Sequence, residues 1–247
     1  MVRVAALGDT HMTTASAGRL RTALTGVAAH ADLLLLAGDL TNDGRIEEAE
    51  MVCAELEGLD LPMLAVLGNH DHDSGLGERV VEMLRAAGVE VLEGTGVVLD
   101  VVGVRVGVAG LKGTGGGFDV DATPETVTER SSGLVLRPAS VERLAPALQA
   151  LDADVRIALV HYSPTPDTLV GEPERIWWNL GNHLLGAAVD AGGAHLAVHG
   201  HAHHGTEEGH TAGGCPVRNV ARWVLGRPYA VYALSGAGVL MDRRASR

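Results

Sequence analysis

Five short apolar runs in the chain each end just before residues that can bind a metal ion. The runs span 2–7, 33–37, 63–67, 155–160 and 196–198. The polar residues that follow them include Asp9, His11, Asp39, Asn69, His70, His161, His201 and His203. Short apolar runs bounded by turn residues are typical of buried strands. If the five strands belong to one sheet, their polar ends meet at one edge, where such sheets carry ligand sites.

The first third of the chain alternates predicted strands with predicted helices. About 30 residues, the length of one strand–helix–strand unit, separate Asp9 from Asp39 and Asp39 from Asn69. The predicted helices are 19–29 with a cap near Ser16, 46–56 with Asp43 as cap and Gly58 as end, and 78–87. This alternation favours a mainly parallel sheet covered by helices.

The remainder of the chain mixes a hairpin, helices and further strands. Residues 97–102 and 104–109 flank Gly103 and predict an antiparallel hairpin. Helices are expected over 140–151, with a kink at Pro146, and over 175–191. Strands are expected over 217–220, 229–234 and 239–241. Because no linker divides the sequence, we expect a single domain over residues 1–247.

One segment, residues 113–133, is rich in Gly, Thr and acidic residues. It is longer than most loops of compact domains, and loops of this length often carry function. Two interpretations stay open for it. It is either a lid or specificity loop over a site, or a surface insertion.

The composition narrows the class of protein. Apolar residues make up 46% of the chain, and the formal net charge is −12, which argues against nucleic acid or an acidic membrane as partner. No apolar stretch approaches the roughly 20 residues that span a bilayer, and VRVAAL at the start does not resemble a signal peptide. The two cysteines predict no disulfide framework. We expect a soluble cytoplasmic protein, and the oligomeric state, including a homo-oligomer, stays open.

The residues at the strand ends offer carboxylate, imidazole and amide oxygen donors without a thiolate. This mixture suits Mn, Fe or Zn better than a structural zinc or a calcium site. The candidate ligands are Asp9, His11, Asp39, Asn69, His161, His201 and His203. Seven ligands are too many for one ion, but they fit two divalent or mixed-valence ions that share a carboxylate. Any one of these residues alone could be a helix cap or an ordinary histidine; their joint placement favours a metal site.

Five short motifs in the chain resemble those of the calcineurin-like metallophosphoesterases, in particular the small bacterial phosphodiesterases and phosphohydrolases. The motifs are Gly8-Asp9-Thr10-His11, Gly38-Asp39, Gly68-Asn69-His70-Asp71, His161 and Gly200-His201-Ala202-His203, in the family's order. The resemblance implies a four-layer α/β sandwich of two mixed β-sheets flanked by helices. It also implies a dinuclear metal site at the carboxyl ends of the strands.

The resemblance further implies a role for each motif residue. Asp9, His11 and His203 would hold the first ion, Asn69, His161 and His201 the second, and Asp39 would bridge the two. A hydroxide bridging the ions would attack the phosphate ester. His70 would stabilise the developing charge or protonate the leaving oxygen, and Asp71 would orient the His70 ring. Asn42 either reaches a substrate phosphate or caps the helix that follows.

The function that this implies is metal-dependent hydrolysis of a small-molecule phosphate ester, with a phosphodiester favoured. The alternative within enzymes is a phosphomonoesterase. A nuclease is opposed by the acidic charge balance. A non-catalytic scaffold is opposed by the complete set of candidate ligands.

Overall fold

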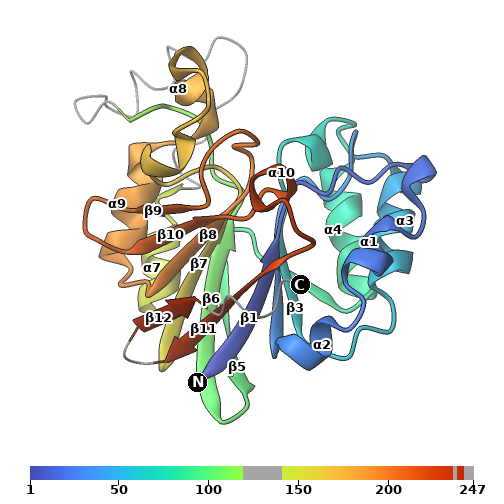
Figure 1. Cartoon of the computed structure of the whole chain (residues 1–247), viewed down its shortest axis with the longest axis horizontal. Coiled ribbons are helices and arrows are strands. Elements are labelled where there is room, and N and C mark those ends of the chain that lie inside the picture. Colours follow the sequence, from blue (N-terminus) through green and yellow to red (C-terminus); the bar gives the residue numbers. More distant parts are fainter. Residues whose placement is uncertain (119–140, 236–237, 242–247) are drawn as a thin grey trace.

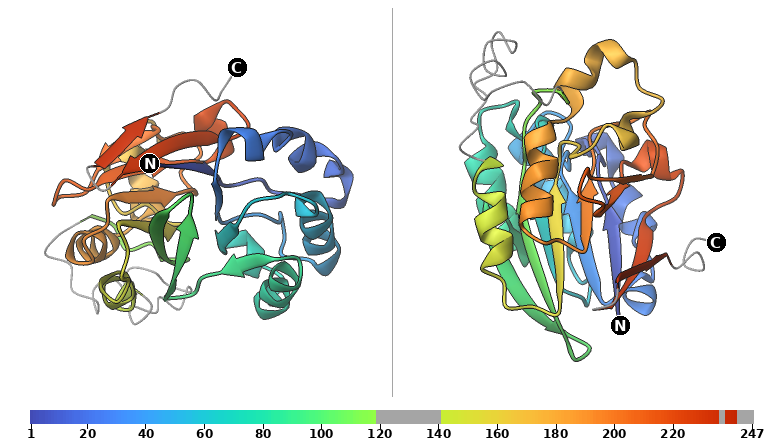
Figure 2. Two further views of the ribbon diagram at one scale, coloured as in Figure 1. Left: turned by 90° about the horizontal axis from the view of Figure 1, so that it is seen from below. Right: turned by 90° about the vertical axis from the view of Figure 1, so that its left-hand side faces the viewer.

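The computed structural model describes residues 1–118, 141–235 and 238–241. Two mixed six-stranded sheets pack face to face between two layers of helices (Figures 1 and 2). The first sheet has the order β12 (Gly238–Met241), β11 (Ala230–Ser235), β1 (Val2–Leu7), β2 (Leu33–Ala37), β3 (Met63–Val66) and β4 (Val89–Val91). The second has the order β5 (Thr95–Val101), β6 (Val104–Leu111), β7 (Val155–Val160), β8 (Leu196–His199), β10 (Pro216–Asn219) and β9 (Glu208–His210). The predicted four-layer arrangement is confirmed.

The central strands are apolar along their whole length because both faces are covered. Side chains alternate between the two faces of a strand. Leu33 and Leu35 of β2 face the core between the sheets, whereas Leu34 and Leu36 face the helices on the outside. Such doubly covered strands read as continuous apolar runs, which is why 33–37 is visible in the sequence as LLLLA.

Helices cover the outer face of each sheet. The first sheet is covered by α1 (Arg19–Ala23), α2 (Val27–His30), α3 (Ile46–Leu56) and α4 (Gly77–Ala86). The second is covered by α7 (Leu144–Gln149) and α9 (His183–Ala191). The short helices α8 (Trp177–Leu180) and α10 (Arg222–Leu225) lie near the upper end of the sandwich in Figure 1. Single 3₁₀ turns are η1 (Thr14–Ser16), η2 (His70–His72), η3 (Asp167–Leu169) and η4 (Glu174–Ile176). Within the described residues, no helix is long and apolar enough to cross a membrane.

Two predicted long helices are each divided in the structure. The helix expected over 19–29 breaks at Gly26, whose φ of 74° lies in the left-handed region. The helix expected over 175–191 breaks at Gly181, where a Cβ atom would lie 2.4 Å from the Ser163 carbonyl oxygen. After this break, the Asn182 side chain accepts a hydrogen bond from the Leu184 amide and caps α9. An apolar period alone could not show either break.

Two smaller expectations about helices were wrong. Arg45, and not Asp43, is the N-cap residue of α3. Pro146 lies in the first turn of α7, where its missing N–H would have no partner within the helix, so it causes no kink. The hairpin prediction is confirmed, since Val101 pairs with Val104 across a turn with positive φ at Val102 and Gly103. Of the segment 113–133, residues 119–133 lie outside the described residues.

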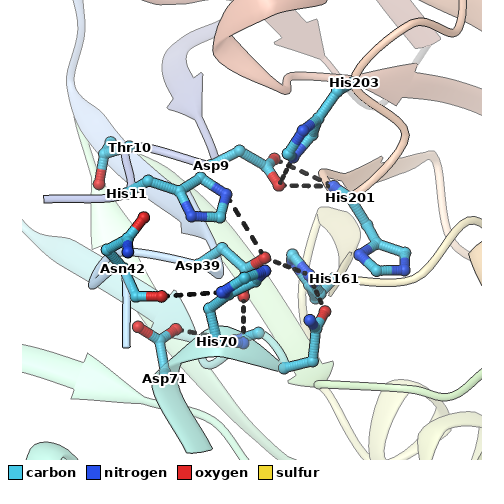
Figure 3. Close-up of polar contacts among 12 residues, drawn as sticks. Asp9, Thr10, His11, Asp39, Asn42, His70, Asp71, His161, His201 and His203 are labelled. Carbon is cyan, nitrogen blue, oxygen red and sulfur yellow. Dashed lines mark hydrogen bonds and ion pairs between the residues drawn. The ribbon is translucent and has the colours of Figure 1, made fainter. Parts of the chain in front are cut away.

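The strands that precede the candidate ligands do not belong to one sheet. β1, β2 and β3 are neighbours in the first sheet, and β7 and β8 are neighbours in the second. The five strands therefore follow the two-sheet arrangement that the family resemblance implies, and the alternative of one sheet does not apply. Because the two sheets pack face to face, the carboxyl ends of all five strands still lead to one region (Figure 3). The site thus lies across the two sheets.

Candidate metal centre

The loops after β1, β2, β7 and β8 bring carboxylate and imidazole groups together at the end of the sandwich (Figure 3). Three groups of side chains have donor atoms within 4.8 Å of one another. They are Asp9 with His11 and His203, Asp39 with His161 and His201, and His11 with Asp39 and His70. The first two groups consist of residues that the family resemblance assigns to the first ion and to the second, with Asp39 in the second group. Asp39 and His11 belong to the third group as well, so the two sites adjoin.

Individual distances define how the two groups meet. In the first group, His203 Nε2 lies 2.9 Å from Asp9 Oδ1. In the second, His161 Nε2 lies 3.3 Å from Asp39 Oδ2 and 3.2 Å from the side-chain oxygen of Asn69. Asn69, the predicted amide ligand, therefore lies at the second group. Between the groups, His11 Nε2 lies 3.7 Å from Asp39 Oδ2.

The backbone at these residues is strained. Among the described residues, five that are not glycine have positive φ, and four of them are candidate ligands: Asp9 (57°), His11 (42°), Asp39 (49°) and His201 (68°). Each such residue costs about 1–3 kcal/mol, and strain of this kind gathers at functional sites because the surrounding structure holds it in place. The fifth, Val102, lies in the β5–β6 turn. The strain thus falls on the candidate ligands.

Two buried polar atoms at the centre fit a bound cation. His11 Nε2 and Asp39 Oδ2 are buried and make no hydrogen bond to any described residue. Buried polar atoms nearly always have a hydrogen-bond partner, so such a pair calls for a ligand. Both atoms can donate an electron pair to a metal, and the surrounding donors are imidazoles, carboxylates and an amide oxygen. This donor set fits Mn, Fe or Zn.

In the second group, the main electrostatic interactions are those of the Asp39 carboxylate. Burial would raise the pKa of Asp39, but the positive charge of His161, 3.3 Å away, and other nearby groups outweigh it, so the pKa lies well below its ordinary value. Burial lowers and the Asp39 carboxylate raises the pKa of His161, with a net rise to about 9. Burial lowers the pKa of both His11 and His201, which keeps these rings in the neutral form that binds metals. A cation bound here would replace the His161 proton as counter-charge to Asp39.

Two glycines permit the close approach of the loops. A Cβ atom on Gly68 would lie 2.0 Å from Asp39 Oδ1, and one on Gly200 would lie 2.2 Å from Asp9 Oδ2. Any side chain at these positions would therefore collide with a candidate ligand. The glycines of the motifs are needed so that the two carboxylates can enter the centre.

His70 lies at the rim of the centre, and its partners differ from those expected. Its Nδ1 lies 2.8 Å from the Asn42 carbonyl oxygen and 3.3 Å from Asp73 Oδ2. Its backbone N–H donates to Asp39 Oδ1 at 2.8 Å. The His70 ring is thus oriented by Asn42 and Asp73, and the orienting contact expected from Asp71 is not made.

Asp71 instead joins two of the loops that carry the candidate ligands. Its carboxylate is fully buried. It accepts hydrogen bonds from the backbone of Leu40, from the backbone and hydroxyl of Thr41, and from the backbone of Gly68, at 2.6–3.3 Å. The residue after His70 therefore holds the Asp39 loop against the Asn69 loop.

The end of β10 joins the two sheets beside the centre. The Val220 carbonyl oxygen accepts a hydrogen bond from the Gly8 amide at 2.9 Å. The Asn219 side chain donates to the carbonyl oxygen of Ala202, between His201 and His203, at 2.8 Å. This segment therefore supports the loops of Asp9 and of His203 together.

Trp223 is a neighbour of the centre that no sequence motif indicates. Its ring lies 4.3 Å from that of His203 and 5.4 Å from that of His11, measured between centroids. The residue is 47% exposed. A single tryptophan in a four-residue helix has no detectable period. The residues Asn219 and Val220, which anchor Ala202 and Gly8, lie shortly before it in the chain.

Known structures with the same fold differ in what they are described to do. Phosphopantetheinyl hydrolase from Mycobacterium tuberculosis matches with a TM-score of 0.62 at 16% identity, over 98% of this chain and 95% of its own. A candidate 5′-nucleotidase from Staphylococcus aureus matches with a TM-score of 0.61 at 16% identity, over 97% of this chain and 52% of its own. GAP50, the anchor in the inner membrane complex of Plasmodium, matches with a TM-score of 0.57 at 10% identity, over 99% and 86%.

A search of curated proteins gave no significant match. The family model of the calcineurin-like phosphoesterases matches residues 2–205. This range contains all seven candidate ligands together with His70 and Asp71. The chain therefore belongs to the calcineurin-like phosphoesterase family.

Proposed function

We propose that the protein hydrolyses a phosphate ester of a small molecule, with a phosphodiester favoured, at a centre of two metal ions. The observation that carries the proposal is the pair of donor groups that adjoin where His11 faces Asp39, with one buried atom of each of these two residues lacking a hydrogen bond to the described residues. The names of two structures with this fold, a phosphopantetheinyl hydrolase and a candidate 5′-nucleotidase, also support phosphoester hydrolysis.

In this proposal the first ion is held by Asp9, His11 and His203, and the second by Asn69, His161 and His201, with Asp39 shared. When bound, two such ions supply a nucleophile near neutral pH by lowering the pKa of water, and they neutralise charge on the phosphoryl group. The chain's own part is to hold the donors in place. Hydrogen bonds to the loop backbones fix the positions of the donors, and the glycines leave room for the two carboxylates.

His70 is the proposed group for charge stabilisation or proton transfer to the leaving oxygen. Asn42 and Asp73 both approach its Nδ1 atom, which leaves Nε2 as the nitrogen that can face a substrate. The side chain of His70 is 38% exposed, so a substrate can reach it. Asn42 stays a proposed substrate residue, although its amide group donates to Asp43 at 2.9 Å in this structure.

The sequence and one structural neighbour bear on the class of substrate. The chain's Gly68-Asn69-His70-Asp71 motif resembles that of small bacterial phosphodiesterases. A phosphomonoesterase is the second candidate, supported by the name of the candidate 5′-nucleotidase. The net charge of −12 disfavours a nuclease. The full donor set disfavours a scaffold like the anchor GAP50.

Replacement of the shared carboxylate tests the two-ion assignment. Asp39→Ala should abolish both metal content and hydrolysis, because each ion loses a ligand. Metal analysis of the purified variant, beside hydrolysis of bis(4-nitrophenyl) phosphate with added Mn²⁺, measures the two effects. Asp100→Ala, at an exposed position of β5, is the matched control and should change neither. An Asp39→Ala protein that still holds two ions would contradict the assignment.

Replacement of His70 separates chemistry from metal binding. His70→Ala should leave the metal content unchanged and lower kcat by roughly 10²–10⁴-fold, the range for acid–base groups. His204→Ala, at an exposed position just beyond the last motif, should leave kcat unchanged. Because His70 also lies in a donor group with His11 and Asp39, loss of an ion from the variant would show that His70 is a ligand.

The ester preference is tested by paired substrates. With Mn²⁺, the protein should cleave bis(4-nitrophenyl) phosphate with a higher kcat/KM than 4-nitrophenyl phosphate, because we expect a diester substrate. Release of 4-nitrophenolate measures both reactions in one assay. Faster cleavage of the monoester would indicate that the protein is a phosphomonoesterase and not a phosphodiesterase.

Asp71 is tested as a residue that joins loops. Asp71→Asn should lower the free energy of unfolding by about 1–3 kcal/mol, because an amide cannot accept all the hydrogen bonds of the buried carboxylate. Urea denaturation measures the loss. Asp60→Asn, at an exposed position, should cost nothing measurable. A variant with unchanged stability and reduced kcat would instead indicate that Asp71 acts on the His70 ring.

A further inference from the structure

Three arginines surround a pocket that is separate from the donor groups of the centre. The pocket has a volume of about 320 Å³ and lies between α1, α10 and the loop that follows β1. Its polar lining is dominated by Arg19, Arg222 and Arg227, and its apolar lining includes Leu7, Met12 and Leu20. This volume is within the range of small-ligand sites, about 300–1,000 Å³. None of its lining residues is acidic, although the chain has a formal charge of −12.

The positive charge of the pocket is only partly compensated. Arg227 forms an ion pair with Glu207. Arg222 donates to the Thr10 carbonyl oxygen at 3.2 Å and lies over the Trp223 ring at 4.6 Å, but it has no carboxylate partner among the described residues. Arg19 is exposed, and its side chain forms neither a hydrogen bond nor an ion pair with any residue in the described part of the chain.

The two arginines without carboxylate partners lie close enough to affect each other. The pKa of Arg222 is lowered by burial and, after that, by the positive charge of Arg19. Two cations held together without a counter-charge repel each other, and an anion between them would relieve that repulsion. Guanidinium groups also match the geometry of phosphate and carboxylate oxygens.

The pocket is on the other side of a loop that carries two candidate metal ligands. Asp9 and His11 belong to the donor groups, while Thr10 and Met12 line the pocket. The Thr10 hydroxyl donates to the Leu40 carbonyl oxygen at 2.8 Å, which holds this residue away from the centre. The alternation of side chains along 9–12 therefore separates the two sites.

Arg222 connects the pocket to the rim of the centre. It lies over Trp223, and the Trp223 ring in turn contacts the rings of His203 and His11. A ligand on Arg222 would thus be one aromatic ring away from two donors of the first group. The pocket therefore lies close to the centre, but the candidate metal ligands do not line it.

We propose that this pocket binds a small phosphate-type oxyanion through Arg19 and Arg222, with Arg227 as a third cation at its edge. This binding does not depend on the proposed hydrolysis. The oxyanion has two possible sources, which are a free phosphate ion and a second phosphate group on the substrate. Both would meet the same guanidinium groups.

Phosphate binding to the full chain tests the pocket. Inorganic phosphate is titrated calorimetrically into the wild-type protein, Arg19→Gln, the double variant Arg19→Gln/Arg222→Gln, and the control Arg79→Gln, an exposed arginine of α4 outside the pocket. Arg19→Gln should weaken one class of phosphate site about five- to tenfold, because it removes one charge-assisted contact. The double variant should lose that class, and Arg79→Gln should retain it.

Phosphate bound at the metal centre is a separate class that none of these variants removes. Titrations of Arg19→Gln and the double variant that match the wild type would overturn the proposal. Since Arg19 is exposed and without a described partner, Arg19→Gln should fold normally, and it decides the outcome even if the double variant fails to fold.

The source of the oxyanion is tested with two diester probes, thymidine 5′-(4-nitrophenyl phosphate) and the same compound carrying a 3′-phosphate. If the substrate supplies the oxyanion, Arg19→Gln should raise KM for the 3′-phosphorylated probe alone, by the factor found in calorimetry. If a free phosphate ion occupies the pocket, Arg19→Gln should weaken phosphate binding without separating the two KM values. Failure to hydrolyse either probe would count against the proposed function, while the calorimetric result would still decide the pocket.

Discussion

The buried carboxylate of Asp39 is the contact on which the arrangement of the centre depends. One oxygen accepts the His70 backbone N–H, and the other faces the rings of His11 and His161. A buried carboxylate without compensation is unstable. Here the compensation comes from groups on both sheets, because His161 follows β7 and Asp39 follows β2. The charge of Asp39 therefore requires the two sheets to meet at this end.

The loops around this carboxylate are held by backbone hydrogen bonds and by close approach. Asp71 joins the loops after β2 and β3, and the segment after β10 joins Gly8 to the loop of His203. These contacts hold the left-handed backbone of Asp9 and Asp39 in place. The strain and its support are on the same few loops, which is typical of functional sites. Rigid strand ends and tightly held loops together give the donors fixed positions before any ion arrives.

The sequence predicts the strands and the donors well, since both depend on local pattern. The run 33–37 is apolar because both of its faces are buried, and Asp39 follows it in a short motif. The division into two sheets is not visible in the runs themselves, because a doubly buried strand has the same composition in either sheet. It was the resemblance to the family that supplied the two-sheet architecture.

Most of the features that could not be predicted depend on contacts between distant residues. The break at Gly181 comes from the Ser163 carbonyl oxygen, and Leu40 and Thr41, which donate to Asp71, lie 31 and 30 residues away from it in the chain. The same is true of Trp223 beside His203 and of the arginine pocket, which joins α1 to residues 222–228.

The number of metal ions bound per chain is the most direct test of whether the centre holds two ions. Native mass spectrometry of the purified protein, with elemental analysis of the same sample, measures both the number and the identity of the ions. Two transition-metal ions per chain are expected after incubation with Mn²⁺, because the donor group of Asp9, His11 and His203 adjoins that of Asp39, His161 and His201. A saturated protein that binds a single ion, or none, would contradict the two-ion assignment.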